Sequence, residues 1–173
     1  SALRTPTPIL DVPQSLSIVT SEEILRRGFT SVSDIIEYLP GVSMSQGEGH
    51  RDAVVFRGVR STADFFIDGV KDDVQYYRPL YNLEQLEVLR GPNALLFGRG
   101  GTGGILNRVT KKANTGENFS QLTGYADSFG AGGLQGDVNI GLSDTVAFRV
   151  NAMAEGLDNH RDHYDGERGG INP

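Results

Sequence analysis

The sequence predicts a small α+β domain, in which a mixed β-sheet packs with short helices, followed by the first strands of an antiparallel sheet. Three observations predict this fold class. Short apolar runs alternate with capped helical segments. A glycine-rich stretch then separates two strands within residues 86–110. Regular alternation of apolar and polar residues follows residue 113, so we divide the chain into domains 1–113 and 114–173.

Composition excludes several functions. The 173 residues are enough for one domain of ordinary size. The formal net charge of −6 and the lack of a basic stripe argue against a nucleic-acid partner. Because the chain has no cysteine, disulfides and thiolate metal sites are excluded. No apolar run approaches the ~20 residues of a membrane-spanning helix.

The first domain begins with a proline-rich lead-in and a strand around residues 16–18. Thr20 is expected to cap a helix that ends at Gly28. A second helix is expected from about Ser31, with Asp34 as its capping-box partner and an apolar stripe along one side. The pair Pro40-Gly41 is expected to end this second helix. Both helices are interpreted as scaffold.

Further strands are expected at 53–56 and 64–67. The pair Asp68–Gly69 suits a hairpin turn. Asn82 is placed to cap a short helix that continues through Leu86.

Residues 86–110 organise the first domain. They indicate a strand, a turn that begins at Pro92, a glycine-rich tip and a second strand. The letters Gly98-x-Gly100-x-x-Gly103 match a dinucleotide-binding fingerprint, but that fingerprint continues into a helix, and here a strand follows. The Gly-Lys-Ser/Thr ending of a phosphate-binding loop is absent. Nucleotide binding is therefore not expected.

The second domain contains three expected strands, at 119–129, 134–142 and 146–155. The last two have one apolar and one polar face, and the first shows weaker alternation. Strands of about ten residues with this alternation are typical of membrane β-barrels. A soluble hairpin with one solvated face is the alternative. The polar tail at 158–167 is expected to be a loop, and His160-x-x-His163 within it matches no strong metal-binding pattern.

Several motifs resemble the plug of TonB-dependent outer-membrane receptors, particularly siderophore receptors. They follow the order and spacing of that family over roughly residues 8–113. The segments are VPQSLSIVT at 12–20, DIIEYLPGV at 34–42, FRG at 56–58, FIDGV at 66–70, and LEVLRGP followed by GGI within 86–105. Beside such a plug, the alternating strands are interpreted as the first strands of a transmembrane β-barrel.

The resemblance implies a receptor and not an enzyme. Such a receptor performs TonB-dependent uptake of ferric siderophores across the bacterial outer membrane, and its plug closes the barrel. The siderophore already coordinates the iron, so neither a cofactor nor a protein metal site is expected. TonB would bind a segment upstream of Ser1, and outer-membrane lipid would contact the apolar strand faces. Three strands cannot close a barrel, so the chain is expected to be part of a longer protein.

Two groups of residues are predicted to act in this function. Three polar loops are expected to line the ligand site, because arginine offers a planar donor fork and tyrosine a ring with a polar tip. The predicted ligand-binding residues are His50, Arg51, Tyr76, Tyr77, Arg78, Phe97 and Arg99. The resemblance also implies that Arg57 and Arg90 pair with glutamates of the inner barrel wall, with Glu87 as a further plug–barrel contact.

Two other functions stay open at this point. One is a TonB-dependent receptor for another ligand, such as cobalamin, haem or a glycan. The other is a soluble signalling or binding module with the plug fold. A catalytic role is least favoured, because the histidines and serines form no recognisable catalytic set.

Overall fold

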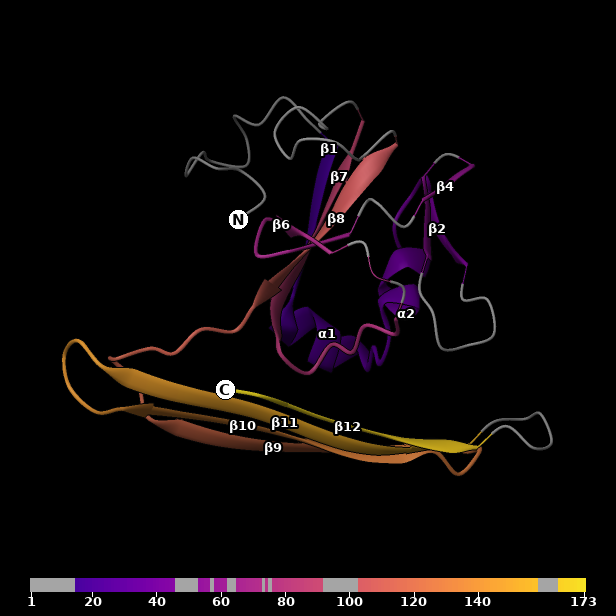
Figure 1. The fold of residues 1–173 in the computed structure, drawn as a ribbon. Coiled ribbons are helices and arrows are strands. Elements are labelled where there is room, and N and C mark those ends of the chain that lie inside the picture. Colours follow the sequence, from indigo (N-terminus) through magenta and orange to yellow (C-terminus); the bar gives the residue numbers. More distant parts are fainter. Residues whose placement is uncertain are drawn as a thin grey trace. The chain divides into compact units, whose positions relative to one another are not determined.

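The computed structural model of the chain describes residues 15–45, 53–56, 58–61, 65–72, 74, 76–91, 103–158 and 165–173. The chain forms two compact units, Ser1–Thr110 and Lys111–Pro173, and each is described by itself (Figure 1). No helix within the described ranges is long and apolar enough to cross a membrane.

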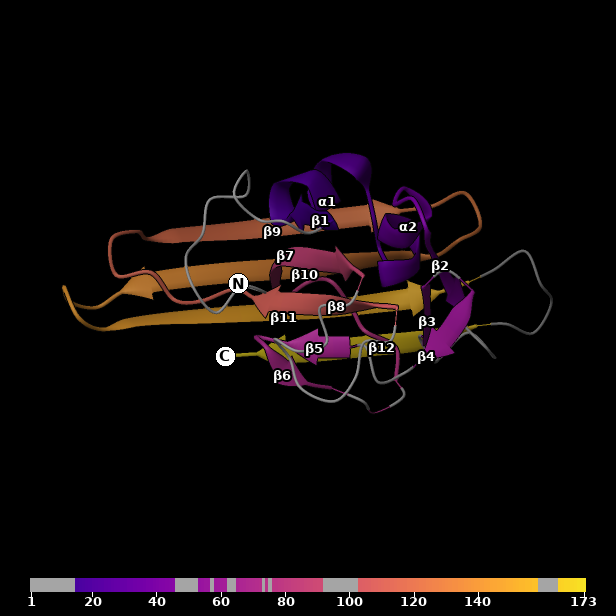
Figure 2. The same cartoon turned by 90° about the horizontal axis from the view of Figure 1, so that it is seen from above.

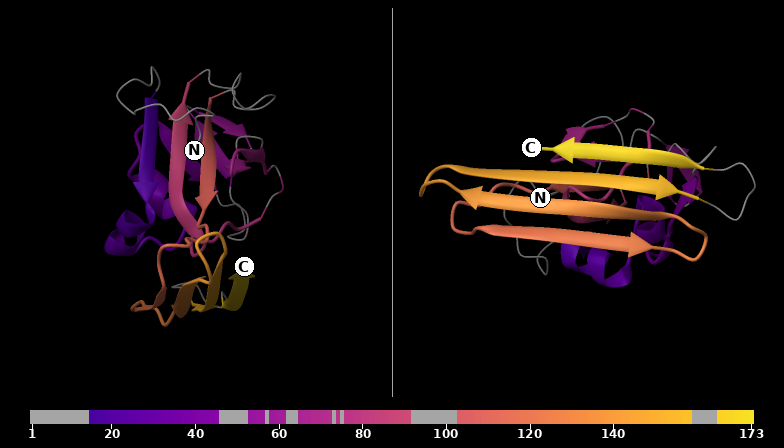
Figure 3. Two further views of the ribbon diagram at one scale, coloured as in Figure 1. Left: turned by 90° about the vertical axis from the view of Figure 1, so that its left-hand side faces the viewer. Right: turned by 90° about the horizontal axis from the view of Figure 1, so that it is seen from below.

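A five-stranded mixed sheet forms the centre of the first unit, in the order β1-β7-β8-β5-β6. Strand β5 runs parallel to β8, and the other neighbours are antiparallel (Figure 2). The strands β1, β7 and β8 lie side by side in Figure 3. The bounds are β1 (Ser15–Thr20), β5 (Phe65–Ile67), β6 (Val70–Lys71), β7 (Leu83–Arg90) and β8 (Gly104–Thr110). The mixed sheet predicted from the sequence is confirmed.

Both predicted helices form, and local chemistry sets their ends. They are α1 (Ser21–Arg27) and α2 (Val32–Glu37). The Thr20 side chain accepts a hydrogen bond from the first turn of α1, and Gly28 ends that helix in the left-handed conformation, at φ 69°. Ser31 and Asp34 form a complete capping box at the start of α2.

Apolar side chains pack on both faces of the five-stranded sheet. The larger cluster joins the sheet to the two helices and includes Ile24, Val32, Ile35, Ile36, Phe65, Leu86, Val88 and Leu106. The smaller cluster, on the opposite face, consists of Phe66, Leu89 and Ile105, with Leu16 packed against it. Strands β7 and β8 are therefore buried on both faces over much of their length, and polar residues within them, such as Glu87 and Arg108, are buried as well.

The predicted helix over residues 82–86 is wrong, because residues 83–86 form the first half of β7. Leu83 and Leu86 are spaced as on one face of a helix, and both are buried in the larger cluster. A register shift between Leu83 and Gln85 in the β7–β8 ladder explains how a strand achieves this spacing. The extra residue of such a bulge turns the strand, so both leucines reach the same core.

A second, three-stranded sheet has the order β2-β3-β4 and is antiparallel. Its strands are β2 (Val42–Ser45), β3 (Ala53–Phe56) and β4 (Val59–Ser61). The sequence predicted only β3. The Phe56 ring lies against the start of β8, where a Cβ atom added to Gly104 would lie 2.6 Å from Phe56 Cε1 and 2.5 Å from the Leu89 carbonyl oxygen. The glycine-rich stretch therefore ends in glycine because the backbone is in close contact there.

We expect Gly104→Ala to destabilise the first unit by about 1–3 kcal/mol, because the new methyl group overlaps both backbone and ring atoms. The measurement is the denaturant concentration at which the purified protein becomes sensitive to protease in this unit. Gly136→Ala is the matched control, since a Cβ at that strand position meets no atom within 4 Å. Equal effects of the two substitutions would contradict the packing argument.

The second unit is a four-stranded antiparallel sheet in the order β12-β11-β10-β9 (Figure 3). Its strands are β9 (Phe119–Ala126), β10 (Gly132–Gly141), β11 (Ala147–Leu157) and β12 (Gly166–Asn172). The first three correspond to the three predicted strands. Strand β12 was not predicted, and the expected loop over 158–167 gives way to it at Gly166. Its glycine-rich sequence carries too little apolar alternation to indicate a strand.

The two faces of this sheet differ as the alternation predicted. Leu134, Val138, Ile140 and Phe148 project from one face, with exposed fractions of 40–57%. The alternate positions on the other face are polar, and Asn139 there is completely buried. One surface of the sheet is therefore apolar, and the opposite one is polar.

Residues 111–118, here called the tether segment, pack on the polar face. The Asn139 amide binds the backbone of this segment through three hydrogen bonds. Its Oδ1 accepts from the Asn114 N–H at 2.9 Å, and its Nδ2 donates to the carbonyls of Asn114 and Glu117 at 2.8 and 2.6 Å. The Asn139 side chain thus makes backbone hydrogen bonds of the kind that a neighbouring strand would make.

Charged groups add further attachments to the tether segment. Asp137 accepts two hydrogen bonds from Arg149, at 2.9 and 2.8 Å, and forms an ion pair of 2.9 Å with Lys111. Arg149 also donates to the Lys112 carbonyl at 2.9 Å. Such fork-shaped contacts fix orientation as well as distance.

We expect Asn139→Ala to loosen the tether segment, because it removes all three hydrogen bonds and leaves backbone groups unsatisfied at a cost of about 1–3 kcal/mol. Hydrogen exchange at the Asn114 amide should become faster in the purified protein. Gln121→Ala is the control, since Gln121 lies on the same polar face but is exposed. Unchanged exchange at Asn114 would show that Asn139 does not hold the segment.

Candidate functional site

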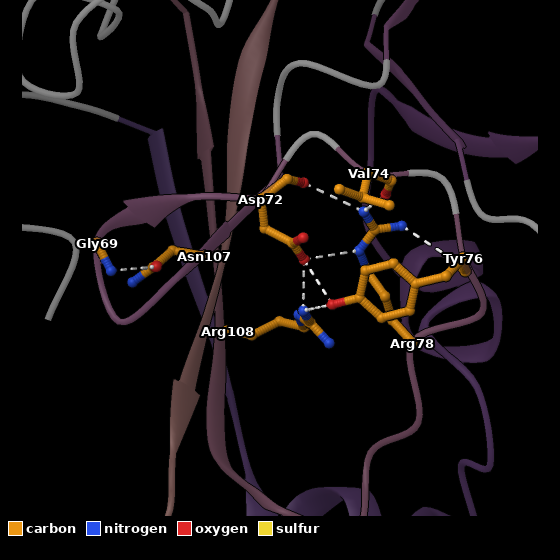
Figure 4. A network of polar contacts seen from close by, with 7 residues as sticks. All are labelled: Gly69, Asp72, Val74, Tyr76, Arg78, Asn107 and Arg108. Atoms are coloured by element: carbon orange, nitrogen blue, oxygen red, sulfur yellow. Dashed lines mark hydrogen bonds and ion pairs between the residues drawn. The ribbon is translucent and has the colours of Figure 1, made fainter.

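Asp72, Tyr76, Arg78 and Arg108 form a buried polar cluster in the first unit, here called the Asp72 network (Figure 4). Three of the four residues lie in segment 72–78, which follows β6, and Arg108 lies on β8. The network therefore joins a connecting segment to the centre of the sheet. Tyr76 and Arg78 were among the predicted ligand-binding residues.

The β5–β6 hairpin brings Asp72 next to β8. Asp68 and Gly69 form its turn with positive φ angles of 48° and 81°, as in the favoured two-residue hairpin turns. The Asp68 carboxylate accepts hydrogen bonds from the backbone N–H and the hydroxyl of Thr110, at 3.0 and 2.6 Å. The Gly69 N–H donates to Asn107 Oδ1 at 3.0 Å (Figure 4). These contacts fix the turn to the end of β8.

One carboxylate oxygen organises the network. Asp72 Oδ2 accepts from Arg108 Nη2 at 2.6 Å, from the Tyr76 hydroxyl at 2.7 Å and from Arg78 Nε at 3.3 Å. Arg108 also donates to the Tyr76 hydroxyl. Both arginine side chains are at most 4% exposed, and Asp72 is 12% exposed. A buried guanidinium needs such a partner, because an uncompensated buried charge is strongly destabilising.

Arg78 serves as the core of segment 72–78. Its Nη2 donates to the carbonyls of Asp72 and Val74 at 3.2 and 2.6 Å, and its Nη1 donates to the Tyr76 carbonyl at 3.1 Å. The guanidinium carbon lies 3.7 Å from the centre of the Phe65 ring and 4.4 Å from that of Tyr76. The described residues of this segment therefore surround a cation that lies close to two aromatic rings.

The environment shifts the ionisation of two members. Burial raises the pKa of Tyr76, and its hydrogen bond to Asp72 adds to this increase. Burial lowers the pKa of Arg78, and the Asp72 charge opposes that decrease. Tyr76 thus stays a neutral donor to the carboxylate. Because the Asp72 carboxylate and the Tyr76 hydroxyl are both bonded within the network, the arrangement suits a rigid support better than a reactive site.

The far end of the segment is tied to the start of α2. The Tyr77 hydroxyl donates to the Thr30 carbonyl at 3.3 Å, and Pro79 forms a β-bridge with Ser31. Val74 lies between this end of the segment and Asp72, and its side chain is 65% exposed. The segment is therefore held at both ends and presents an apolar side chain at its middle.

A family model described as the TonB-dependent receptor plug domain matches residues 8–105, which is more than half of the chain. The chain belongs to this plug-domain family. In the plug, the Asp72 network supports one of the three loops that the sequence had singled out.

Curated relatives and solved structures agree with this assignment. The probable TonB-dependent receptor BfrD of Bordetella pertussis is 32% identical over 152 residues, which are 84% of this chain and 20% of BfrD. The catecholate siderophore receptor Fiu of Escherichia coli K12 is 29% identical over 172 residues, which are 96% of this chain and 22% of Fiu. This chain thus spans about a fifth of the length of these curated relatives.

The likeness in structure extends over both units. The open form of the ferric-catecholate import receptor Fiu of E. coli K12 has a TM-score of 0.81 at 29% identity, covering 95% of this chain and 24% of Fiu. The siderophore receptor PiuA of Acinetobacter baumannii has a TM-score of 0.87 at 26% identity, with the same coverage. A plug followed by antiparallel strands, as predicted, is therefore the fold of this chain.

The structure separates the predicted ligand-binding residues into two groups. Tyr76, Tyr77 and Arg78 are described above; the remaining four lie outside the described residues, and these are His50, Arg51, Phe97 and Arg99. Tyr76 and Arg78 lie beside Arg108, near the end of β8, whereas the glycine-rich tip precedes the start of that strand. That the three loops line one ligand site stays a prediction.

The predicted plug–barrel residues divide in the same way. Arg57 lies outside the described residues. Glu87 is 2% exposed and accepts hydrogen bonds from Asn107 Nδ2 at 2.9 Å and from Gln85 Nε2 at 2.6 Å. Arg90 is half-buried and bonds to strand β1. Their contacts with a barrel wall stay predictions.

Asp72 and Arg108 were missed by the sequence reasoning. A signal was present, because an arginine within the apolar strand sequence Ile105–Thr110 requires an acidic partner inside the fold. The sequence cannot say which of the nearby aspartates supplies it.

We expect Arg78→Lys to loosen segment 72–78 although it keeps the charge, because an ammonium cannot reproduce the planar fork that binds three carbonyls. The loss should be about 1–3 kcal/mol and should appear as faster hydrogen exchange in this segment of the purified receptor. Arg26→Lys, at an exposed position of α1, is the matched control. If both variants exchange like the parent protein, the fork does not hold the segment.

Proposed function

We propose that the chain is the plug and the adjoining wall strands of a receptor that takes up ferric siderophores across the bacterial outer membrane. One observation carries this proposal. The structures of two siderophore receptors, Fiu and PiuA, correspond to 95% of the chain and include both of its units. The apolar face of the β9–β12 sheet adds support, because exposed apolar strands of this length suit a lipid environment.

The receptor binds and transports its ligand and breaks no bond in it. The siderophore delivers the iron already coordinated, so the iron is cargo and the plug needs no cofactor. TonB engages a segment upstream of Ser1 and pulls on the plug, which opens a path through the barrel. The plug's contribution is to close the barrel at rest and to help bind the ligand.

The predicted residues receive roles within this proposal. His50, Arg51, Phe97 and Arg99 contact the ligand, together with Tyr76 and Tyr77. For Arg78 the contacts favour an indirect role, because its donors already bind the backbone of the segment that carries both tyrosines. Arg57 and Arg90 pair with carboxylates of the barrel wall, since a desolvated arginine needs an acidic partner, and Glu87 is a further plug–barrel contact.

We expect cells that express the full-length gene under iron limitation to grow on at least one ferric siderophore supplied alone. Growth should disappear in a strain without TonB, because the pull on the plug supplies the energy for uptake. Growth on free ferrous iron, in both strains, is the control for viability.

Growth that does not depend on TonB would contradict the proposal. Lack of growth on every siderophore, with the protein confirmed in the outer membrane, would favour a receptor for cobalamin, haem or a glycan. Lack of membrane association would favour a soluble plug-like module.

A further inference from the structure

Strand β1 lies at one edge of the five-stranded sheet, and β7 is its partner in the described sheet. The antiparallel register places Ser15 opposite Arg90 and Thr20 opposite Gln85. The chain therefore enters the sheet at the end where Arg90 lies. A pull from upstream reaches this end of β1 first.

The Arg90 guanidinium rests on two hydroxyl groups of β1. Its Nη1 donates to Ser15 Oγ at 3.0 Å, and its Nη2 donates to Ser17 Oγ at 2.9 Å. Ser15 and Ser17 are two residues apart, so both side chains project from the same face of the strand. The spacing matches the two terminal nitrogens of the guanidinium fork.

We propose that Ser15 and Ser17 are positioning residues that aim Arg90 while β1 is docked, and that separation of this end of β1 releases Arg90. The inference rests on the proposed function, because TonB supplies the pull. The orientation of the Arg90 side chain then depends on whether this end of β1 is docked on β7. Its contact with the barrel wall is made only in the docked state.

The register gives the order of events. Peeling from the entry end breaks the pairs Ser15–Arg90, Leu16–Leu89 and Ser17–Val88 before it reaches Val19. Val19 is buried in the larger cluster, so the inner half of β1 is held more firmly. Release of Arg90 therefore requires only the outer half of the strand to separate.

The opposite end of the plug is fastened more strongly. Thr110 donates two hydrogen bonds to the Asp68 carboxylate, and Arg108 is paired with Asp72. β8 lies between two neighbouring strands, whereas β1 has β7 on one side only in the described sheet. A pull on the plug therefore separates β1 before it disturbs β8.

Two disulfide staples test the order of events in the full-length receptor. One joins Leu16→Cys to Leu89→Cys in the outer half of β1, and the other joins Thr20→Cys to Gln85→Cys at its inner end. Directly opposed residues of antiparallel strands lie about 4.5–5.5 Å apart between Cα atoms, which a disulfide spans. This chain has no cysteine that could compete.

We expect the outer staple to abolish TonB-dependent uptake and a reductant to restore it, while the inner staple leaves uptake intact. The same variants in reduced form are the controls for the lost leucine packing. Unchanged uptake with the outer staple, or an equal loss with both staples, overturns the inference. Absence of TonB-dependent uptake in every reduced variant and in the parent protein indicates failure of the proposed function instead.

The two hydroxyls are tested by replacing both serines. Ser15→Ala with Ser17→Ala should raise TonB-independent entry of a large antibiotic, as Arg90→Ala should, because Arg90 is no longer aimed at the wall. Ser15→Thr with Ser17→Thr should restore the resting state, since it keeps both hydroxyls. Adding the two alanines to Arg90→Ala should cause no further leak. A full additional leak, or a parental leak for the alanine pair, overturns the positioning role.

Discussion

The burial of β7 and β8 on both faces is the constraint on which the plug depends. Two apolar clusters enclose these strands, so each polar side chain that is buried on them needs a partner inside the fold. Glu87 meets this need through Asn107, the residue directly opposite, and Arg108 meets it through Asp72. The loop between β6 and β7 is thus attached at Arg108, the residue of the sheet that needs a carboxylate partner.

Features set by neighbouring residues could be predicted from the sequence, and those set by distant ones could not. The capping box at Ser31 and the stop at Gly28 depend on contacts within four residues. The Asp72–Arg108 pair joins residues 36 positions apart, and no local pattern marks it. Tyr76 was found as a candidate residue, but its partners, and therefore its role beside Arg108, follow only from the fold.

The four-stranded sheet uses one alternating sequence for two purposes. Its apolar face carries exposed leucine, valine and isoleucine side chains, while its polar face binds a segment of the same chain. Asn139 illustrates the second purpose, because all of its amide donors and acceptors serve backbone groups of the tether segment. Alternation predicted both faces, but not that one of them would be filled by the chain itself.

The depth of the Asp72 network has a consequence for ionic strength. At 0.1 M salt, dissolved ions screen the interactions between exposed charges over a length of about 10 Å, but they weaken buried ion pairs much less. The pair between Glu23 and Arg27 on α1 is partly exposed, so dissolved salt weakens it. Asp72 and its arginines are shielded by the plug. Segment 72–78 should therefore keep its shape in dilute and in saline surroundings alike.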